Sequence, residues 1–537
     1  MEDERMTRMK MTRRLLCATL TLMLLAQGSS TAAQTERPEV RVEIDAAQSG
    51  PTIDPNIFGQ FAEHLGTGIY GGVWVGPDSS IPNVRGIRTD VVQALRAIKA
   101  PNVRWPGGCF ADEYHWRDGI GPASQRRHRL NASWGNVIEP NSFGTHELMD
   151  FVDQIGAEVF LSVNVGSGTV QEAADWLEYL TADQPTALAQ ERAANGHPEP
   201  YRIRYLGLGN ENWGCGGAMS AEHYVEEMKQ YAHYSRNLDP AQTRDNAMQR
   251  IAVGWDSGSA DYTEAVMQAW KDKVWSWDIE GLSLHGYTIP NSWEAKGPSV
   301  GFGEDEYAKA IKATLKMEDW ITSQTAIMDR YDPDKKLALF VDEWGLWADP
   351  MPGSNPGFLQ QQNTMRDAVI AALNLNIFMR HADRVRGTNI AQMANVLQAM
   401  ILTDGPNMVL TPTYHVYEMY VPFQNATLIP SQFDAGAYAF GDVSVPGADA
   451  VVARATDGAL WLSLVNVDPE RPLALTVRVA GEHRTAIGRI LTAPAVDSHN
   501  SFDQPGAVQP APFAGRVVEG QLSFDLPPKS IAVVEVR

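Results

Sequence analysis

The stretch LGLGNENWGCGG, residues 206–217, places a carboxylate between two asparagines, after an apolar run and before a glycine-rich loop. A short apolar run bounded by turn residues is typical of a buried β-strand. The glycines that follow allow a loop to pass close to a bound molecule. The stretch therefore predicts a strand that ends in a functional acid, Glu211.

Seven other runs along the chain have the same apolar or β-branched character. The eight runs span residues 56–65, 102–108, 157–166, 204–212, 250–258, 279–287, 337–345 and 386–396. Helical periodicity separates them, as in TVQEAADWLEYL at 169–180, where Thr169 and Glu172 have capping-box spacing. Eight alternations of strand and helix predict an α/β fold, a (β/α)8 or TIM barrel.

The pattern changes near residue 411, where helical periodicity gives way to short alternating strands. In AVVARATDGALWLSLVNV, residues 450–467, the TDG segment marks a hairpin turn. We therefore expect an all-β sandwich at the C-terminus and an N-terminal strand that joins it. The predicted domains are residues 34–50 for that strand, 51–410 for the barrel and 411–537 for the sandwich.

Length and charge limit the function. With 537 residues, the chain is long enough for two cores. Its formal charge of −21 disfavours nucleic acid or an anionic membrane as a partner, because neither attracts an acidic surface. A neutral ligand is the simpler expectation.

The N-terminus has the pattern of a targeting segment. Arg13 and Arg14 precede an apolar run at residues 15–26, which is too short to span a membrane, and small residues follow it. We expect a signal peptide over residues 1–33 and a secreted or periplasmic protein.

Polar residues end all eight runs. They are Glu63, Arg104, Asn164, Asn210 with Glu211, Asp256, His285, Glu343 and Gln392. For any single one of these residues, capping of the next helix is the simpler explanation. In a (β/α)8 barrel, however, the carboxyl ends of all strands meet at one face, so eight polar ends predict a shared pocket.

Two acids in that pocket, Glu211 and Glu343, fit glycoside hydrolysis. That reaction needs one carboxyl group to protonate the leaving oxygen and a second to attack the anomeric carbon or activate water. Metalloprotease, zinc-ribbon, hydrolase-elbow and P-loop motifs are missing from the sequence. We expect no metal and no cofactor. Trp213, Trp344 and Trp347 are equally compatible with core packing and with stacking on a sugar.

Long motifs give the chain a family resemblance. It resembles the retaining α-L-arabinofuranosidases of glycoside hydrolase family 51 through FAEHLGTGIYGGVWVG at 61–76, RWPGGCFADEYHWRDGIGP at 104–122, NSFGTHELMDFVDQIGAE at 141–158, LGNENWGCGG, SLHGY, FVDEWGLW and TPTYHVYEMY at 411–420. The resemblance implies a barrel with a jelly-roll sandwich, and a homo-oligomer of six or fewer subunits. Glu211 then matches the general acid/base, and Glu343 matches the nucleophile.

The expected substrate-binding residues lie around these acids. They are Glu63, Arg104, Cys109, Asn210, His285, Tyr287 and Gln392. Many members of the family have asparagine where this chain has Cys109. The resemblance implies an exo-acting arabinofuranosidase for arabinose-containing plant polysaccharides or oligosaccharides. Two alternatives remain at this stage: an endo-β-1,4-glucanase or xylan-active hydrolase with the same acids, and a non-catalytic carbohydrate-binding protein.

Cys109 and Cys215 both fall in predicted active-site loops. A disulfide is one interpretation, because both loops rim the same barrel mouth, but free thiols are the interpretation we favour. Since a thiol is a weaker hydrogen-bond donor than an amide, we predict that Cys109→Ala lowers activity less than Asn210→Ala does. Steady-state kinetics of the two variants measure this, and a larger loss in Cys109→Ala contradicts it.

Overall fold

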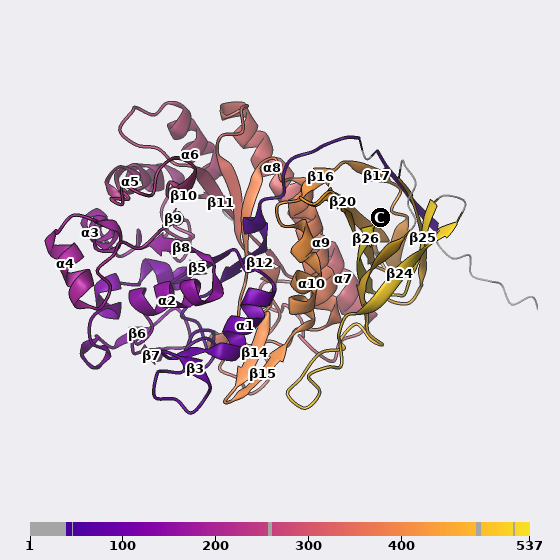
Figure 1. Ribbon diagram of the computed structural model, residues 1–537, viewed down its shortest axis with the longest axis horizontal. Coiled ribbons are helices and arrows are strands. Elements are labelled where there is room, and N and C mark those ends of the chain that lie inside the picture. Colours follow the sequence, from indigo (N-terminus) through magenta and orange to yellow (C-terminus); the bar gives the residue numbers. More distant parts are fainter. Residues whose placement is uncertain (1–38, 46, 256–259, 480–484, 519–520) are drawn as a thin grey trace, which may run out of the picture. The chain divides into compact units, whose positions relative to one another are not determined.

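A computed structural model describes residues 39–45, 47–255, 260–479, 485–518 and 521–537 (Figure 1). The expected signal peptide, residues 1–33, and the strand-end residue Asp256 lie outside this part of the chain. None of the helices within these ranges is both long enough and apolar enough to cross a membrane.

Eight parallel strands close into a barrel in chain order, which confirms the predicted TIM barrel. They are β2 (Gly59–Phe61), β5 (Asn102–Trp105), β8 (Glu158–Val163), β9 (Tyr205–Leu208), β10 (Gln249–Trp255), β11 (Gly281–Thr288), β12 (Ala338–Leu346) and β13 (Val385–Ile390). Pairing of Asn389 with Gly59 joins the last strand to the first. Several of the predicted runs extend beyond their strands, because their polar ends form the loops of the pocket.

Helices connect these strands and cover the barrel. They are α1 (Thr89–Ala97), α2 (Thr145–Ile155), α3 (Val170–Thr181), α4 (Ala187–Ala194), α5 (Ala221–Tyr234), α6 (Asp261–Lys271), α7 (Glu304–Thr314), α8 (Lys316–Tyr331) and α9 (Met365–Arg380). The Thr169 hydroxyl accepts a hydrogen bond from the Glu172 N–H and starts α3. The Glu172 carboxylate bonds His115 instead of returning to the cap.

The C-terminal domain is all-β, and its ten strands share one apolar core. In spatial order they are β16 (Thr427–Ile429), β20 (Ala448–Arg454), β21 (Leu460–Asn466), β26 (Ser530–Val536), β23 (Ala486–Leu491), β24 (Ala511–Val518), β25 (Gln521–Leu526), β22 (Leu473–Val479), β1 (Glu39–Ile44) and β17 (Ser431–Phe433). β1 pairs in parallel with β22 and places Val40 and Val42 in the core. The alternation of buried and exposed residues in β1 fits this position.

Four small hairpins complete the strands. They pair β3 (Asn83–Val84) with β4 (Ile87–Arg88), β6 (Arg129–Asn131) with β7 (Val137–Glu139), β14 (Ile401–Asp404) with β15 (Asn407–Leu410), and β18 (Ala437–Phe440) with β19 (Val443–Pro446).

One segment departs from the expectation that helices end near residue 411. Residues 412–420 form a further helix, α10 (Pro412–Tyr420). The Thr411 hydroxyl accepts from the Tyr414 N–H at its start, and Pro412 stands in the first turn, where its missing N–H costs nothing. Nearly every side chain of α10 is buried, so the helix has no alternation of apolar and polar faces from which its period can be recognised in the sequence.

Helix α9 lies between the barrel and the all-β domain and is buried along nearly its whole length. Asn376 and Arg380 of α9 both donate to the Asp449 carboxylate in β20, at 2.9 and 2.8 Å. The Tyr307 hydroxyl of α7 donates to the Val467 carbonyl, at 2.6 Å. The two domains therefore share a polar and apolar interface.

A separate cluster of large side chains fills part of the barrel interior. The cluster consists of Phe160, Tyr205, Ile251, Ala338 and Phe340. The Phe340 ring lies 5.2 Å from that of Tyr205, and Gly387 of β13 pairs directly with Phe340 of β12. A Cβ atom at position 387 would lie only 2.3 Å from that ring. Glycine is therefore required there by packing.

We predict that Gly387→Ala lowers the free energy of unfolding by roughly 1–3 kcal/mol, because the added methyl group overpacks the barrel interior. Chemical denaturation measures the effect. Phe340→Leu creates room at the same place, so the double variant should lose less stability than the two single variants combined. Strict additivity contradicts the packing explanation.

Candidate active site

A cavity of about 730 Å³ opens at the carboxyl ends of the barrel strands. Among the residues that line it are Glu63, Cys109, Trp134, Glu211, Trp213, Cys215, Trp255, His285, Tyr287, Trp293, Trp320, Glu343 and Trp347. Both predicted catalytic acids and several predicted binding residues thus face one cavity. Trp213 and Trp347 line it, whereas Trp344 is fully buried in the core.

The loop after β9 holds Glu211 in an unusual backbone conformation. Its φ is +41°, in the left-handed region that side chains other than glycine rarely adopt. The Glu211 carbonyl accepts from the N–H groups of Gly214 and Gly216, which turns the chain sharply. A Cβ at Gly216 would lie 1.9 Å from the Asn210 carbonyl oxygen. The glycines after Glu211 are therefore needed for this turn.

Asp112 holds this loop in place, although no sequence pattern marks it as functional. It ends the short helix η2 (Cys109–Asp112) after β5 and is buried. One carboxylate oxygen accepts from the N–H groups of Val165 and Gly166, at 2.7 Å each, and the other accepts from the Asn210 N–H, at 2.9 Å. Burial raises the pKa of Asp112 to about 7, and these hydrogen bonds act in the opposite direction. Asp112 thus joins three strand-end loops.

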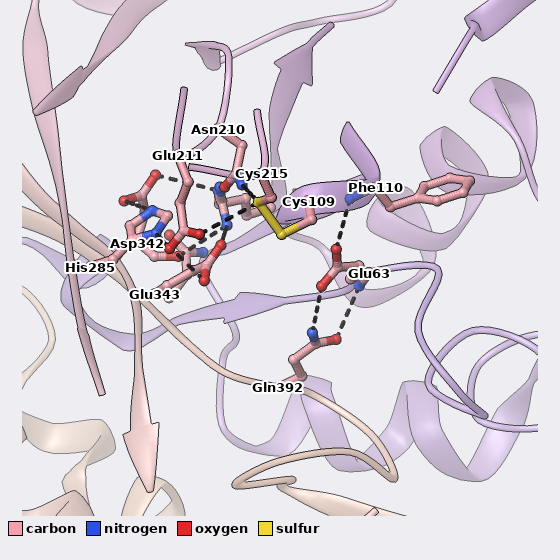
Figure 2. Close-up of polar contacts among 12 residues, drawn as sticks. Glu63, Cys109, Phe110, Asn210, Glu211, Cys215, His285, Asp342, Glu343 and Gln392 are labelled. Atoms are coloured by element: carbon pink, nitrogen blue, oxygen red, sulfur yellow. Dashed lines mark hydrogen bonds and ion pairs between the residues drawn. A yellow bond between two sulfur atoms is a disulfide. The ribbon is translucent and has the colours of Figure 1, made fainter. Parts of the chain in front are cut away.

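Glu343, in the carboxyl-terminal half of β12, is held by two donors. Arg104 donates to its Oε1 at 2.9 Å, and the Tyr287 hydroxyl donates to its Oε2 at 2.9 Å (Figure 2 shows Glu343 among its neighbours). Arg104 also donates to the Asn210 side-chain oxygen, at 2.6 Å. Burial raises the pKa of Glu343, and the positive charges of His285 and Arg104 oppose that rise. Two cations therefore favour an ionised Glu343.

His285 bridges the two acids. Its Nδ1 lies 2.8 Å from Glu211 Oε1 and 3.5 Å from Glu343 Oε2, and its Nε2 lies 3.2 Å from Asp342 Oδ1. Burial by itself lowers the pKa of His285, but Glu343 and Asp342 outweigh burial and raise it to about 10. His285 is therefore an imidazolium at neutral pH. Asp342 has no separate sequence signal besides its place beside Glu343.

Glu63 forms a second polar group on the other side of the cavity. Its Oε1 accepts from the Trp134 indole N–H at 2.8 Å and from the Phe110 N–H at 3.1 Å. Gln392 donates to its Oε2 and accepts from its backbone N–H, each at 3.1 Å. Burial and the charge of Glu343 raise the pKa of Glu63 to about 7. This carboxyl group is therefore held rigidly and faces the cavity.

The structure contradicts the expectation of free thiols. Cys109 and Cys215 form a disulfide between the loops after β5 and β9 (Figure 2). The prediction failed because sequence separation says nothing about Cα proximity, and here the Cα atoms are 5.5 Å apart. As a disulfide sulfur, Cys109 offers a bound molecule shape but no hydrogen-bond donor.

Asn164, the remaining strand-end residue, caps its own loop, since its side-chain oxygen accepts from the N–H groups of Ser167 and Gly168. It does not line the cavity. Trp134 does line the cavity, but it lies in a loop between two short strands and therefore has no strand-end pattern that predicts it.

Two carboxyl groups that face one cavity of a (β/α)8 barrel are the arrangement that glycoside hydrolases use. Models of two family domains match the chain. The α-L-arabinofuranosidase 1 domain matches residues 94–269, and the α-L-arabinofuranosidase C-terminal domain matches residues 342–530.

Known relatives match nearly the whole chain. It is 43% identical over 516 residues to the intracellular exo-α-L-arabinofuranosidase of Bacteroides ovatus, covering 96% of this chain and 98% of that protein. The crystal structure of the family 51 arabinofuranosidase from Xanthomonas axonopodis pv. citri superposes with a TM-score of 0.90 at 47% identity, covering 93% of this chain and 100% of that one. The α-L-arabinofuranosidase from Thermotoga maritima, in an arabinose complex, gives a TM-score of 0.81 at 30% identity, covering 92% and 99%. The chain belongs to the α-L-arabinofuranosidases of glycoside hydrolase family 51, and its substrates contain arabinose.

These relatives correct one expectation. The B. ovatus protein is named an intracellular enzyme, which contradicts the secreted or periplasmic localisation expected from the N-terminus. A basic pair before an apolar run describes only the composition of a short segment. Other N-terminal segments have the same composition, so the pattern did not establish export.

The raised pKa of His285 predicts a pH-dependent stability. The folded protein keeps a proton that the unfolded chain, with a pKa of 6.5, releases. The contribution is therefore fully present below pH 6.5 and is lost as the pH rises to about 10, at no more than about 1.4 kcal/mol per pH unit. We expect His285→Gln to flatten the fall in melting temperature over this range. The exposed His223→Gln is the control, and equal slopes in all three proteins contradict the prediction.

Proposed function

We propose that this enzyme is an exo-acting, retaining α-L-arabinofuranosidase with Glu343 as the nucleophile and Glu211 as the general acid/base. The observation that carries the proposal is the closeness of the two acids. One carboxylate oxygen of each, together with a nitrogen of His285, lies in a group whose atoms are within 4.8 Å of one another. Retaining glycosidases place their carboxyl groups about 5–5.5 Å apart, and inverting enzymes about 6.5–9.5 Å apart. The short separation leaves no room for an attacking water between them.

The hydrogen bonds of the two acids support a different role for each. Glu343 receives hydrogen bonds from Arg104 and Tyr287, which stabilise a negative charge and orient the oxygen for attack on the anomeric carbon. Glu211 lines the cavity, with its Oε1 on His285 and its Oε2 3.5 Å from the Cys215 sulfur. We assign the proton for the leaving group in the first step to Oε2, the oxygen that His285 does not bond.

The second step uses the same residues in reverse. When the glycosyl-enzyme forms on Glu343, the negative charge of that carboxylate is lost. Glu211, now ionised, is stabilised by the His285 imidazolium and can take a proton from the incoming water. Attack of this water on the anomeric carbon releases arabinose with its original configuration and restores both acids.

The polar residues around the acids suit one terminal furanose. Glu63 lines the cavity and offers its carboxylate to sugar hydroxyls, while Gln392 holds that carboxylate in place and Asn210 orients Arg104. Trp213, Trp293 and Trp347 line the outer cavity and offer apolar faces for the remainder of a branched chain. We infer that the natural substrates are plant polysaccharides or oligosaccharides with terminal α-L-arabinofuranosyl residues. Release of monomeric arabinose supports exo action, and release of larger fragments supports the endo-glucanase or xylanase alternative.

Two variants test the assignment of roles. Glu343→Ala should lower kcat by about 10⁴-fold or more on every substrate, because no other group can form the glycosyl-enzyme. Glu211→Ala should lower kcat by roughly 10²–10⁴-fold on oligosaccharides, yet form the glycosyl-enzyme readily from aryl arabinofuranosides whose leaving groups need no proton. A burst of released phenol in rapid-mixing kinetics measures that step. Proton NMR of the first-formed sugar must show retention. Inversion, or near-normal turnover in Glu343→Ala, contradicts the mechanism.

A further inference from the structure

The Cys109–Cys215 disulfide lies directly beside the proposed acid/base. Cys215 Sγ is 3.5 Å from Glu211 Oε2, the oxygen that His285 does not bond. The two sulfur atoms and a Glu211 oxygen all lie within 4.8 Å of one another. In a tetrahedral zinc site, thiolate and carboxylate donors at 2.0–2.3 Å from the metal stand roughly 3.5 Å apart. The Cys215–Glu211 separation already fits such a site, and the two sulfurs reach it by moving apart once the bond between them is broken.

We propose that reduction of the Cys109–Cys215 disulfide creates a binding site for a thiophilic divalent cation such as Zn²⁺, with both thiolates and the Glu211 carboxylate as ligands. Two sulfur donors and one oxygen donor suit zinc better than Mg²⁺ or Ca²⁺, which prefer oxygen donors. The fourth position remains for water. The oxidised protein lacks both thiolates and does not form this site.

A dithiol reductant supplies the electrons for opening the site. Cys215 is exposed, so its sulfur is accessible to a thiolate of the reductant. Attack there forms a mixed disulfide and releases Cys109 as a thiolate. The second thiol of the reductant then releases Cys215 and leaves as a cyclic or protein disulfide, which completes a two-electron exchange. Binding of Zn²⁺ displaces the remaining thiol protons.

Contacts that do not involve sulfur hold the ligands close together after reduction. Asp112 accepts from the Asn210 N–H on one loop and from the Gly166 N–H on the next. The Gly216 N–H donates to the Glu211 carbonyl at 3.1 Å, which keeps Cys215 beside Glu211. Cys109 belongs to the same η2 turn as Asp112. His285 bonds Glu211 Oε1 and orients the carboxylate, as outer-sphere partners of metal ligands commonly do.

Binding of the cation has a functional consequence that rests on the proposed role of Glu211. A carboxylate oxygen bound to zinc cannot carry the proton that the leaving group requires. The cation also occupies part of the cavity beside Glu343. The reduced enzyme should therefore be inhibited by Zn²⁺, whereas the oxidised enzyme should not be.

Metal titration tests the site without reference to catalysis. The chain has three cysteines, so Cys17→Ser provides a background in which only this pair remains. The protein is reduced with dithiothreitol, desalted without oxygen and titrated with Zn²⁺ against a chromophoric chelator. We expect one Zn²⁺ per chain, bound at least about 100-fold more tightly than by the oxidised protein. Cys215→Ser and Glu211→Gln should each weaken binding by at least about 10-fold.

Glu113→Gln is the matched control, since it removes one negative charge just after η2 without touching the ligand set. It should bind Zn²⁺ as the background protein does. Co²⁺ should give a thiolate charge-transfer band only in the reduced protein. Equal Zn²⁺ affinity of the oxidised and reduced proteins, or of Cys215→Ser, overturns the proposal, as does a Co²⁺ complex without that band. Tight binding that leaves turnover of an arabinose-containing oligosaccharide unchanged keeps the cation site but contradicts the role of Glu211.

Discussion

The buried ion cluster at the top of the barrel is the constraint on which the rest of the site depends. Four carboxyl groups, those of Glu63, Glu211, Asp342 and Glu343, surround the cations Arg104 and His285. Charges buried without partners cost several kcal/mol each. The closed barrel brings the cluster together because β2, β5, β9, β11 and β12 all direct their carboxyl ends to one face. An excess of acids over cations leaves the cluster short of positive charge, which is the condition in which one carboxyl group keeps a proton.

The support for this cluster comes from loops and not from the strands alone. Asp112 ties the loops after β5, β8 and β9 through three backbone N–H groups. The left-handed backbone at Glu211 is tolerated because these bonds and the following glycines fix the turn. Fixed donors and acceptors of this kind need no reorganisation during the reaction, which is how a preorganised site lowers a barrier. The disulfide adds a covalent link at the same place, so the redox state of the protein acts directly on the loop of the acid/base.

Below the site, large side chains fill the barrel interior and separate the polar cluster from the opposite end of the barrel. Arg104 contacts this apolar layer, with its guanidinium 6.0 Å from the centre of the Phe160 ring, and it also lies 4.6 Å from the centre of the Phe61 ring. The all-β domain packs on the outside through α9 and donates no residue to the lining of the cavity among the described residues. Its role in the described structure is to cover an apolar face of the barrel.

The sequence by itself determined the eight strands, the helices between them and the two acids, because apolar periodicity and polar strand ends are local features that survive without knowledge of the fold. Long motifs also identified the family before any geometry was known. Only the tertiary structure decided the contacts between segments that are distant in the sequence. These are the Cys109–Cys215 bond, the position of His285 between the two acids, and the hydrogen bonds by which Asp112 joins three loops. Helix α10 was missed because burial on all sides removes the period on which sequence analysis depends. The compartment was predicted wrongly for a related reason, since an N-terminal composition describes a segment and not how the cell processes it.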